Sequence, residues 1–229
     1  MTEKENEVIR DVVKNISKRV ERDNFHSQED DYSPTWGVFL GRMQPIHVGH
    51  IEIIKKMLAE NDYALVLIGS ANKSNQIRNP FTFTFRRMLL RQCFSQDEIN
   101  RMKIVGLPDW STEKNTNDLH QWGDYLYYNI VGNIGRKSFK MYYSDDQSII
   151  NSWFSEDKRK KITIVSIDRE KQQEGISATK IRQALMNDDI DFLKKFLHPR
   201  LFENQTIERM KAVLLHIKEH PKDDFEMGD

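Results

Sequence analysis

Two histidines separated by three positions, His47 and His50, lie in the segment Gly41–His50, which reads GRMQPIHVGH. The apolar run Trp36–Leu40 before this segment is typical of a buried strand, and apolar residues at helical spacing follow it. On the first turn of a helix the two imidazoles would face the same side, near unpaired backbone N–H groups and the positive end of the helix dipole. Arg42 adds a cation that can bind an oxyanion through two hydrogen bonds. The pattern therefore predicts a phosphate-binding site, whereas a His-x-x-His pair without this context would more often be a surface pair.

A second segment with phosphate-binding chemistry, Gly175–Arg182, reads GISATKIR and follows the apolar run Ile162–Ile167. Ser177 fits the N-cap of a helix, which leaves nearby N–H groups free to bind an anion. Thr179 adds a hydroxyl, and Arg182 lies three positions further along the same helical face. Taken alone, the segment fits a capped amphipathic helix with a solvated arginine equally well. Together with the first segment, it predicts the second wall of one triphosphate site.

The elements that must position these residues alternate along the chain. Short apolar runs predict strands at Trp36–Leu40, Tyr63–Ile68, Lys103–Val105, Phe139–Tyr143 and Ile162–Ile167. Helical spacing predicts helices at Val48–Leu58, Phe83–Phe94, Asn117–Val131, Ala178–Met186, Ile190–Leu197 and Leu201–Ile217, with a short helix after the fourth strand. This alternation predicts an α/β fold, a Rossmann-like parallel five-stranded sheet flanked by helices. Such sheets bind ligands beyond the carboxyl ends of their strands.

An N-terminal helical extension is expected to precede this domain. An apolar stripe over Val8–Val20 predicts a helix, and the polar stretch Asp23–Ser33 that follows predicts a linker. The expected organisation is a helix and linker over residues 1–34, one domain over 35–219 with C-terminal helices, and a tail over 220–229. The extension could pack on the domain or on another subunit, so a homo-oligomer is a possible assembly.

Composition excludes several other classes of protein. The 35 Lys and Arg residues balance 35 Asp and Glu residues among the 229, which gives no case for nucleic acid or an anionic membrane as the main partner. The longest apolar run, Tyr63–Ile68, is far too short to span a bilayer, and the charged N-terminus lacks the apolar core of a secretory signal. Cys93 is the single cysteine, so disulfides within the chain and a cysteine-based zinc site are excluded. A cytoplasmic protein is expected.

The two segments also carry a family resemblance. The patterns His-x-Gly-His and Ile-Ser-x-Thr-x-x-Arg resemble the nucleotidylyltransferase superfamily. The wider motif set is similar to the archaeal-type nicotinamide mononucleotide (NMN) adenylyltransferases; it comprises Gly41–His50, Gly69–Ala71, Ile77–Thr82 and Arg86. The resemblance covers about Trp36 to Leu201. It implies an enzyme that joins NMN to ATP, releasing NAD and pyrophosphate.

Carried over position by position, the resemblance assigns roles to individual residues. The residues that it implies for ATP binding are Gly41, Arg42, His47, His50, Arg78, Ser177, Thr179 and Arg182, of which His47, His50, Arg42 and Arg182 would be catalytic. Those that it implies for NMN or NAD are Gly69, Ser70, Phe81, Asp109 and Trp122. Trp122 would stack on the nicotinamide ring, with Trp110 as a rival aromatic residue. Two features depart from the family: the segment from Asp109 to Trp122 is longer, and Leu119 replaces its asparagine. Phe81, Phe83 and Phe85 alternate, which favours core packing.

The expected reaction needs charge neutralisation more than acid–base chemistry, because the phosphate of NMN is already a charged nucleophile. No carboxylate cage is evident in the sequence, so no metal ligands are assigned. A Mg²⁺ ion would be held mainly by ATP phosphates and water. The expected partners are ATP, NMN, NAD and pyrophosphate. Two alternatives remain: a nucleotidylyltransferase with another acceptor, and a non-catalytic sensor of NAD or ATP.

Overall fold

The computed structural model describes residues 33–109, 119–143, 147–168 and 176–220. The predicted N-terminal helix, most of its linker and the predicted tail after His220 lie outside these residues. The five predicted strands are confirmed; they are β1 (Trp36–Gly41), β2 (Tyr63–Ile68), β3 (Met102–Gly106), β4 (Phe139–Tyr143) and β5 (Ile162–Ser166). They form one sheet in the order β3-β2-β1-β4-β5.

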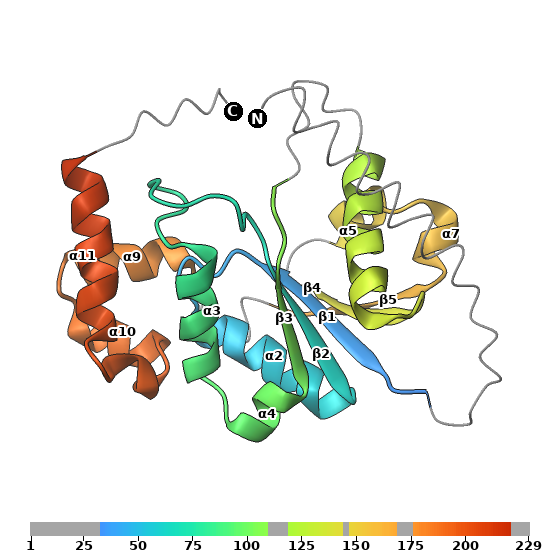
Figure 1. Ribbon diagram of the computed structural model, residues 1–229, viewed down its shortest axis with the longest axis horizontal. Coiled ribbons are helices and arrows are strands. Elements are labelled where there is room, and N and C mark those ends of the chain that lie inside the picture. The colour runs from blue at the N-terminus through green and yellow to red at the C-terminus, as the bar shows by residue number, and fades with distance from the viewer. Residues whose placement is uncertain (1–32, 110–118, 144–146, 169–175, 221–229) are drawn as a thin grey trace.

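Every neighbouring pair in this sheet is parallel, as the alternation of strands and helices predicted. The chain winds outward from β1 to β2 and β3, then returns to the other side of β1 with β4 and β5 (Figure 1). The winding direction therefore reverses between β1 and β4. In doubly wound sheets, ligands usually bind at such a reversal. They occupy the crevice beyond the carboxyl ends of the strands.

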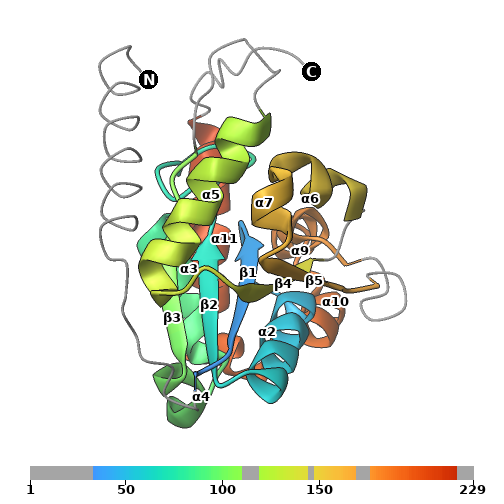
Figure 2. The same cartoon turned by 90° about the vertical axis from the view of Figure 1, so that its right-hand side faces the viewer.

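Helices cover both faces of the sheet (Figures 1 and 2). The longer ones are α2 (Val48–Glu60), α3 (Phe83–Gln92), α5 (Leu119–Ile134), α9 (Ala178–Met186) and α11 (Thr206–Glu219). The shorter ones are α4 (Gln96–Asn100), α6 (Gln147–Trp153), α7 (Glu156–Arg159), α10 (Ile190–Phe196) and the 3₁₀ helix η1 (Pro199–Phe202). None of the described helices has the length and apolar character needed to cross a membrane.

Alternate residues of the strands separate two apolar cores. Phe39 and Val66 face the core that includes α2, α3 and the C-terminal helices. Val38 and Leu65, one position earlier on the same strands, face the core beneath α5. Since successive side chains of a strand point to opposite faces, both faces of the sheet are buried. The near-continuous apolar runs of the sequence follow from this two-sided burial.

The helix α2, which carries the His-x-Gly-His pattern at its start, is fixed at its far end by a long-range contact. The guanidinium of Arg101 donates to the main-chain oxygens of Leu58, Asn61 and Asp62. These oxygens lie at the end of α2 and just beyond it, where helical carbonyls lack partners within the helix. Arg101 thus connects the end of α2 to the start of β3.

One predicted helix was wrong in its extent. The helix expected over Leu201–Ile217 is divided into η1 and α11. Asn204 and Gln205, which separate them, have φ angles of 54° and 56°. This left-handed conformation cannot continue a right-handed helix, so the chain turns here. The short helix α4 was not predicted, although Ser95 and Glu98 form a capping box at its start.

Candidate active site

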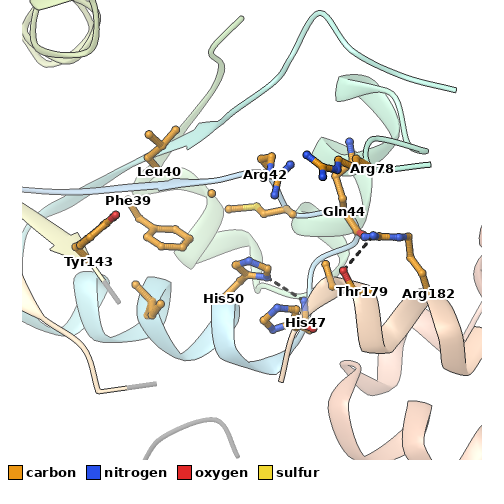
Figure 3. A pocket seen from close by; sticks show the side chains of 15 residues that line it. Phe39, Leu40, Arg42, Gln44, His47, His50, Arg78, Tyr143, Thr179 and Arg182 are labelled. Atoms are coloured by element: carbon orange, nitrogen blue, oxygen red, sulfur yellow. Dashed lines mark hydrogen bonds between the residues drawn. The ribbon is translucent and has the colours of Figure 1, made fainter. Parts of the chain in front are cut away.

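A cavity of about 420 Å³ opens at the reversal point of the sheet. Its walls come from the end of β1 and the loop after it, the end of β4, and the first turns of α2 and α9. Figure 3 shows the two imidazoles at the start of α2, with Thr179 and Arg182 on α9. The described residues that line it are Phe39, Leu40, Gly41, Arg42, Met43, Gln44, His47, His50, Ile53, Arg78, Tyr143, Ser177, Ala178, Thr179 and Arg182. The structure thus brings together all eight residues that were predicted to bind ATP.

The two histidines face the same side, as their spacing predicted. Their ring centroids are 3.8 Å apart. His47 is the N-cap residue of α2, and its backbone N–H donates to Nδ1 of His50 over 3.3 Å. Because Nδ1 of His50 accepts this bond, a neutral His50 carries its proton on Nε2, where the ring can donate to a ligand. The side chain of His47 is only 3% exposed.

Arg182 joins the second segment to the first. Its Nη1 donates to the main-chain oxygen of Gln44 at 2.7 Å, and its Nη2 donates to Oγ1 of Thr179 at 3.2 Å. Ser177 is the N-cap of α9, as predicted, and its side chain accepts the N–H of Lys180. Burial, and secondly the charge of Arg42, lower the pKa of Arg182. A bound anion would relieve this repulsion between neighbouring cations.

Gln44, to which the sequence analysis gave no role, organises the loops around the cavity. Its side chain is 2% exposed and forms two hydrogen bonds with the main chain of Phe81. Nε2 donates to the oxygen of Phe81 at 3.1 Å, and Oε1 accepts its N–H at 2.9 Å. This pairing fixes the loop that carries Arg78 against the loop that carries Arg42. This pairing could not be predicted from the sequence, because the main chain of Phe81 offers the same hydrogen-bonding groups as that of other residues.

Phe81, which the resemblance assigned to NMN, has its ring in the apolar core. Its side chain is 1% exposed and belongs to the apolar core, where its ring lies 5.5 Å from that of Phe85. A ring so fully buried is not available to stack on or line a nucleotide. The ring of Phe81 thus packs in the core, as the alternating phenylalanines favoured, and a role of this residue in NMN binding stays a prediction.

Three of the remaining residues assigned to NMN, Gly69, Ser70 and Asp109, lie just beyond the ends of β2 and β3. Oγ of Ser70 donates to Oδ1 of Asp109 at 2.8 Å, and Nζ of Lys73 lies 3.3 Å from Oδ2 of the same carboxylate. The backbone N–H of Asp109 donates to Oδ1 of Asn72 at 2.8 Å. Gly69 immediately precedes Ser70, whose φ of 48° is in the left-handed region. The loop after β2 is thus bound tightly to the chain that leaves β3.

Trp122 lies on the first turn of α5, near the same corner. Its ring is half-buried, 5.7 Å from the ring of Tyr125 and 6.2 Å from that of Trp153. The hydroxyl of Tyr125 donates to the oxygen of Pro108, next to Asp109. Trp122 does not line the described cavity. Its position fits both an anchor for α5 and a stacking platform, while its rival Trp110 lies outside the described residues.

Arg86 belongs to the motif set that carries the family resemblance, but the resemblance assigned it no role. In the structure its guanidinium is buried among main-chain oxygens. Its side chain is 0% exposed. It donates to the main-chain oxygens of Arg42 and Gly69, each at 2.7 Å, and of Ser70 at 2.9 Å. Burial lowers its pKa to about 10; the charge of Asp109 opposes this shift and that of Arg42 adds to it. Arg86 therefore remains a buried cation at neutral pH.

None of the described residues that line the cavity is acidic. Within the part of the chain that the structure describes, no three His, Cys, Asp or Glu side chains are grouped as metal ligands. The donor set is instead cationic and suits anionic oxygens. A divalent ion at this site would therefore have to be held by a ligand's own phosphates and by water.

The fold and this cavity define a class: a doubly wound nucleotide-binding domain with a cationic pocket at its reversal point. The family follows from comparison with known sequences. The chain belongs to the cytidylyltransferase-like family, whose model matches residues 38–184.

Comparison with curated proteins shows which kind of enzyme within this family the chain resembles. Nicotinamide-nucleotide adenylyltransferase of Thermococcus sibiricus is 26% identical over 191 residues, which cover 82% of this chain and 94% of that protein. The enzyme of the same name from Thermoplasma acidophilum is 39% identical over 70 residues, 31% of this chain. That alignment spans only 39% of the Thermoplasma protein. The sequence resemblance to archaeal-type NMN adenylyltransferases is confirmed.

The fold has counterparts among solved structures. A bifunctional NMN adenylyltransferase/ADP ribose pyrophosphatase from Francisella tularensis, complexed with AMP and a manganese ion, superposes with a TM-score of 0.56. It is 20% identical, and the match covers 82% of this chain and 54% of that one. At this identity the match bears on the fold alone, and it confirms the predicted Rossmann-like class.

Proposed function

We propose that this protein transfers the adenylyl group of ATP to NMN, giving NAD and pyrophosphate. The observation that carries the proposal is the cavity at the reversal point, where two adjacent imidazoles and three arginines of three distant segments converge. The names of the curated relatives support NMN as the acceptor.

In the proposed reaction a phosphate oxygen of NMN attacks the α-phosphorus of ATP in line with the leaving group. The new P–O bond forms as the bond from the α-phosphorus to the bridging oxygen breaks, and that electron pair leaves on pyrophosphate. NMN phosphate needs no general base because it is already ionised. The enzyme's contribution is to position two anions and to neutralise the charge that develops.

Individual residues have distinct roles in this proposal. His47 and His50 donate to α- and β-phosphate oxygens as charge builds on them. Arg42, Arg78 and Arg182 hold the polyphosphate, with the N-terminus of α9 as a further anion-binding wall. A magnesium ion would be held by the phosphates of ATP and by water, and would supply further neutralisation of the phosphate charge.

The corner formed by Ser70 and Asp109 is the proposed place for the nicotinamide nucleotide. The carboxylate of Asp109 is a hydrogen-bond acceptor, and the nearby face of Trp122 suits a flat, positively charged ring. Gly69 lets the chain approach the nucleotide between the two subsites. The main-chain oxygens of Arg42, beside the cavity, and of Gly69, beside this corner, both accept from Nη1 of Arg86.

The test is to incubate the protein with ATP, MgCl₂ and NMN and to measure NAD and pyrophosphate. Equal amounts of both products are expected. Inversion of configuration at phosphorus with chiral α-thio-ATP would support direct in-line attack, and retention would contradict it. Failure with NMN but transfer to another phosphate acceptor would indicate a different nucleotidylyltransferase. Binding of ATP or NAD without turnover would indicate a sensor.

A further inference from the structure

Arg86 connects two loops that otherwise separate beyond the end of the sheet. The last main-chain bond between these loops runs from the N–H of Gly69 to the oxygen of Gly41 at 3.1 Å. Beyond this bond, Nη1 of Arg86 donates to the oxygens of both Arg42 and Gly69, and Nη2 to that of Ser70. Arg86 belongs to a third element, the helix α3, which thus links the segment after β1 to the segment after β2.

The two loops serve different substrates in the proposed function, on which this inference rests. Arg42 lines the cavity assigned to the phosphates of ATP. Ser70 binds Asp109 in the corner assigned to NMN. The planar guanidinium fixes the separation of these two main-chain segments, because its N–H groups lie in one rigid fork. All the hydrogen-bond partners that the structure gives Arg86 are main-chain oxygens.

We infer that Arg86 is a positioning residue that sets the distance between the two bound substrates. It touches neither substrate and acts through Arg42 and Ser70. In-line transfer requires the attacking oxygen and the α-phosphorus to lie within about 3–3.5 Å, and a misplacement of about 1 Å can lower the rate about 100-fold. Each substrate alone needs only its own loop. Removing the link should therefore damage turnover much more than the binding of either substrate.

The experiment compares Arg86→Lys with the matched control Arg87→Lys. Lysine at position 86 keeps the cation but replaces the fork with a single ammonium, so it tests geometry rather than charge. Arg87 is the next residue of α3, is exposed, and lies over the ring of Phe83. The measurements are kcat for NAD formation at saturating MgATP and NMN, the separate dissociation constants of the two substrates by calorimetry, and a melting curve.

For Arg86→Lys, kcat should fall about 100-fold, while each dissociation constant changes less than about threefold. Arg87→Lys should leave all values unchanged. Wild-type kcat in Arg86→Lys would overturn the inference. So would a loss of affinity for both substrates that matches the loss of kcat, or a variant that does not fold, because either would assign Arg86 to stability alone. A wild-type protein that makes no NAD overturns the proposed function as well, whereas active wild-type with an unaffected Arg86→Lys overturns the inference alone.

Discussion

Arg182 and Gln44 are separated by 138 positions in the chain, yet Nη1 of Arg182 donates to the main-chain oxygen of Gln44 at 2.7 Å. This bond holds α9 against the loop after β1. Gln44 in turn binds the main chain of Phe81 through its side chain. One buried residue therefore connects the three segments that carry Arg42, Arg78 and Arg182, and so determines the shape of the cavity.

Arg182→Lys should weaken catalysis because lysine cannot bind Gln44, Thr179 and a phosphate with one planar fork. A lost charge-assisted hydrogen bond contributes about 1.5–3 kcal/mol, so kcat/KM for ATP should fall by roughly one to two orders of magnitude. Steady-state kinetics with varied ATP measures the effect. Gln183→Ala, at the exposed neighbour on α9, is the control and should match the wild type. An unchanged kcat/KM in Arg182→Lys would remove Arg182 from the ATP site.

His47→Ala and His50→Ala should each lower turnover about 10²–10³-fold, the usual value of one donor that acts on developing charge. Because Nδ1 of His50 accepts the backbone N–H of His47 at the N-cap of α2, His50→Ala should also lose some stability. Turnover is measured at saturating substrates, with melting curves beside it. His216→Ala, in an exposed histidine of α11, is the control. If both variants at positions 47 and 50 keep near-wild-type turnover, the phosphate assignment is wrong.

Trp122→Ala distinguishes the two roles that its half-buried position allows. Lost stacking should weaken NMN binding by roughly 1–3 kcal/mol, by analogy with stacking on bases, and leave ATP binding nearly unchanged. Lost packing against Tyr125 and Trp153 should instead lower stability by about 3–5 kcal/mol and disturb both ligands. Separate titrations of NMN and ATP and a melting curve separate these outcomes. We expect the first; unaltered NMN affinity would make Trp110 the next residue to test.

Gly123→Ala should destabilise the protein although alanine favours helices. A Cβ atom at position 123 would lie 1.7 Å from the main-chain oxygen of Trp153, so α5 and α6 would have to move apart. Overpacking of this kind typically costs about 1–3 kcal/mol in the free energy of unfolding, and more where backbone must shift. Gly132→Ala, at an exposed position of the same helix, should instead stabilise by about 0.5–1 kcal/mol. Urea unfolding of the two variants provides the comparison, and equal effects would contradict the close approach.

Acidification should weaken the C-terminal helical region through His198. Burial, followed by the charges of Lys55 and Arg200, lowers the pKa of this histidine from its usual 6.5. Its Nδ1 accepts the N–H of Arg200 at the start of η1, which the protonated ring cannot do. Since the folded-state pKa is below the unfolded value, the unfolded state binds more protons, and stability should decline as pH falls below about 6.5. His198→Asn, which keeps a capping acceptor without titrating, should flatten this part of the melting-temperature profile; an unchanged profile would exclude His198.

Local features of the sequence were sufficient to predict much of the fold and part of the site. The strands from β1 to β5 were predicted because burial on both faces leaves continuous apolar runs. The shared face of His47 and His50 and the capping role of Ser177 depend only on residues three positions apart. Parallel strands also place their carboxyl ends at one edge, so the position of the cavity followed from the alternation of strands and helices.

Tertiary structure alone decided the contacts between residues distant in the chain. The sequence did not indicate that β4 would lie beside β1, which brings Tyr143 to the cavity. Nor did it indicate that Gln44 and Arg86 would bind main-chain oxygens and N–H groups of other segments. Such partners carry no side-chain signature, because every residue offers the same main-chain groups. Periodicity and capping are short-range and can be read locally, whereas these buried bonds exist only after the whole chain has packed.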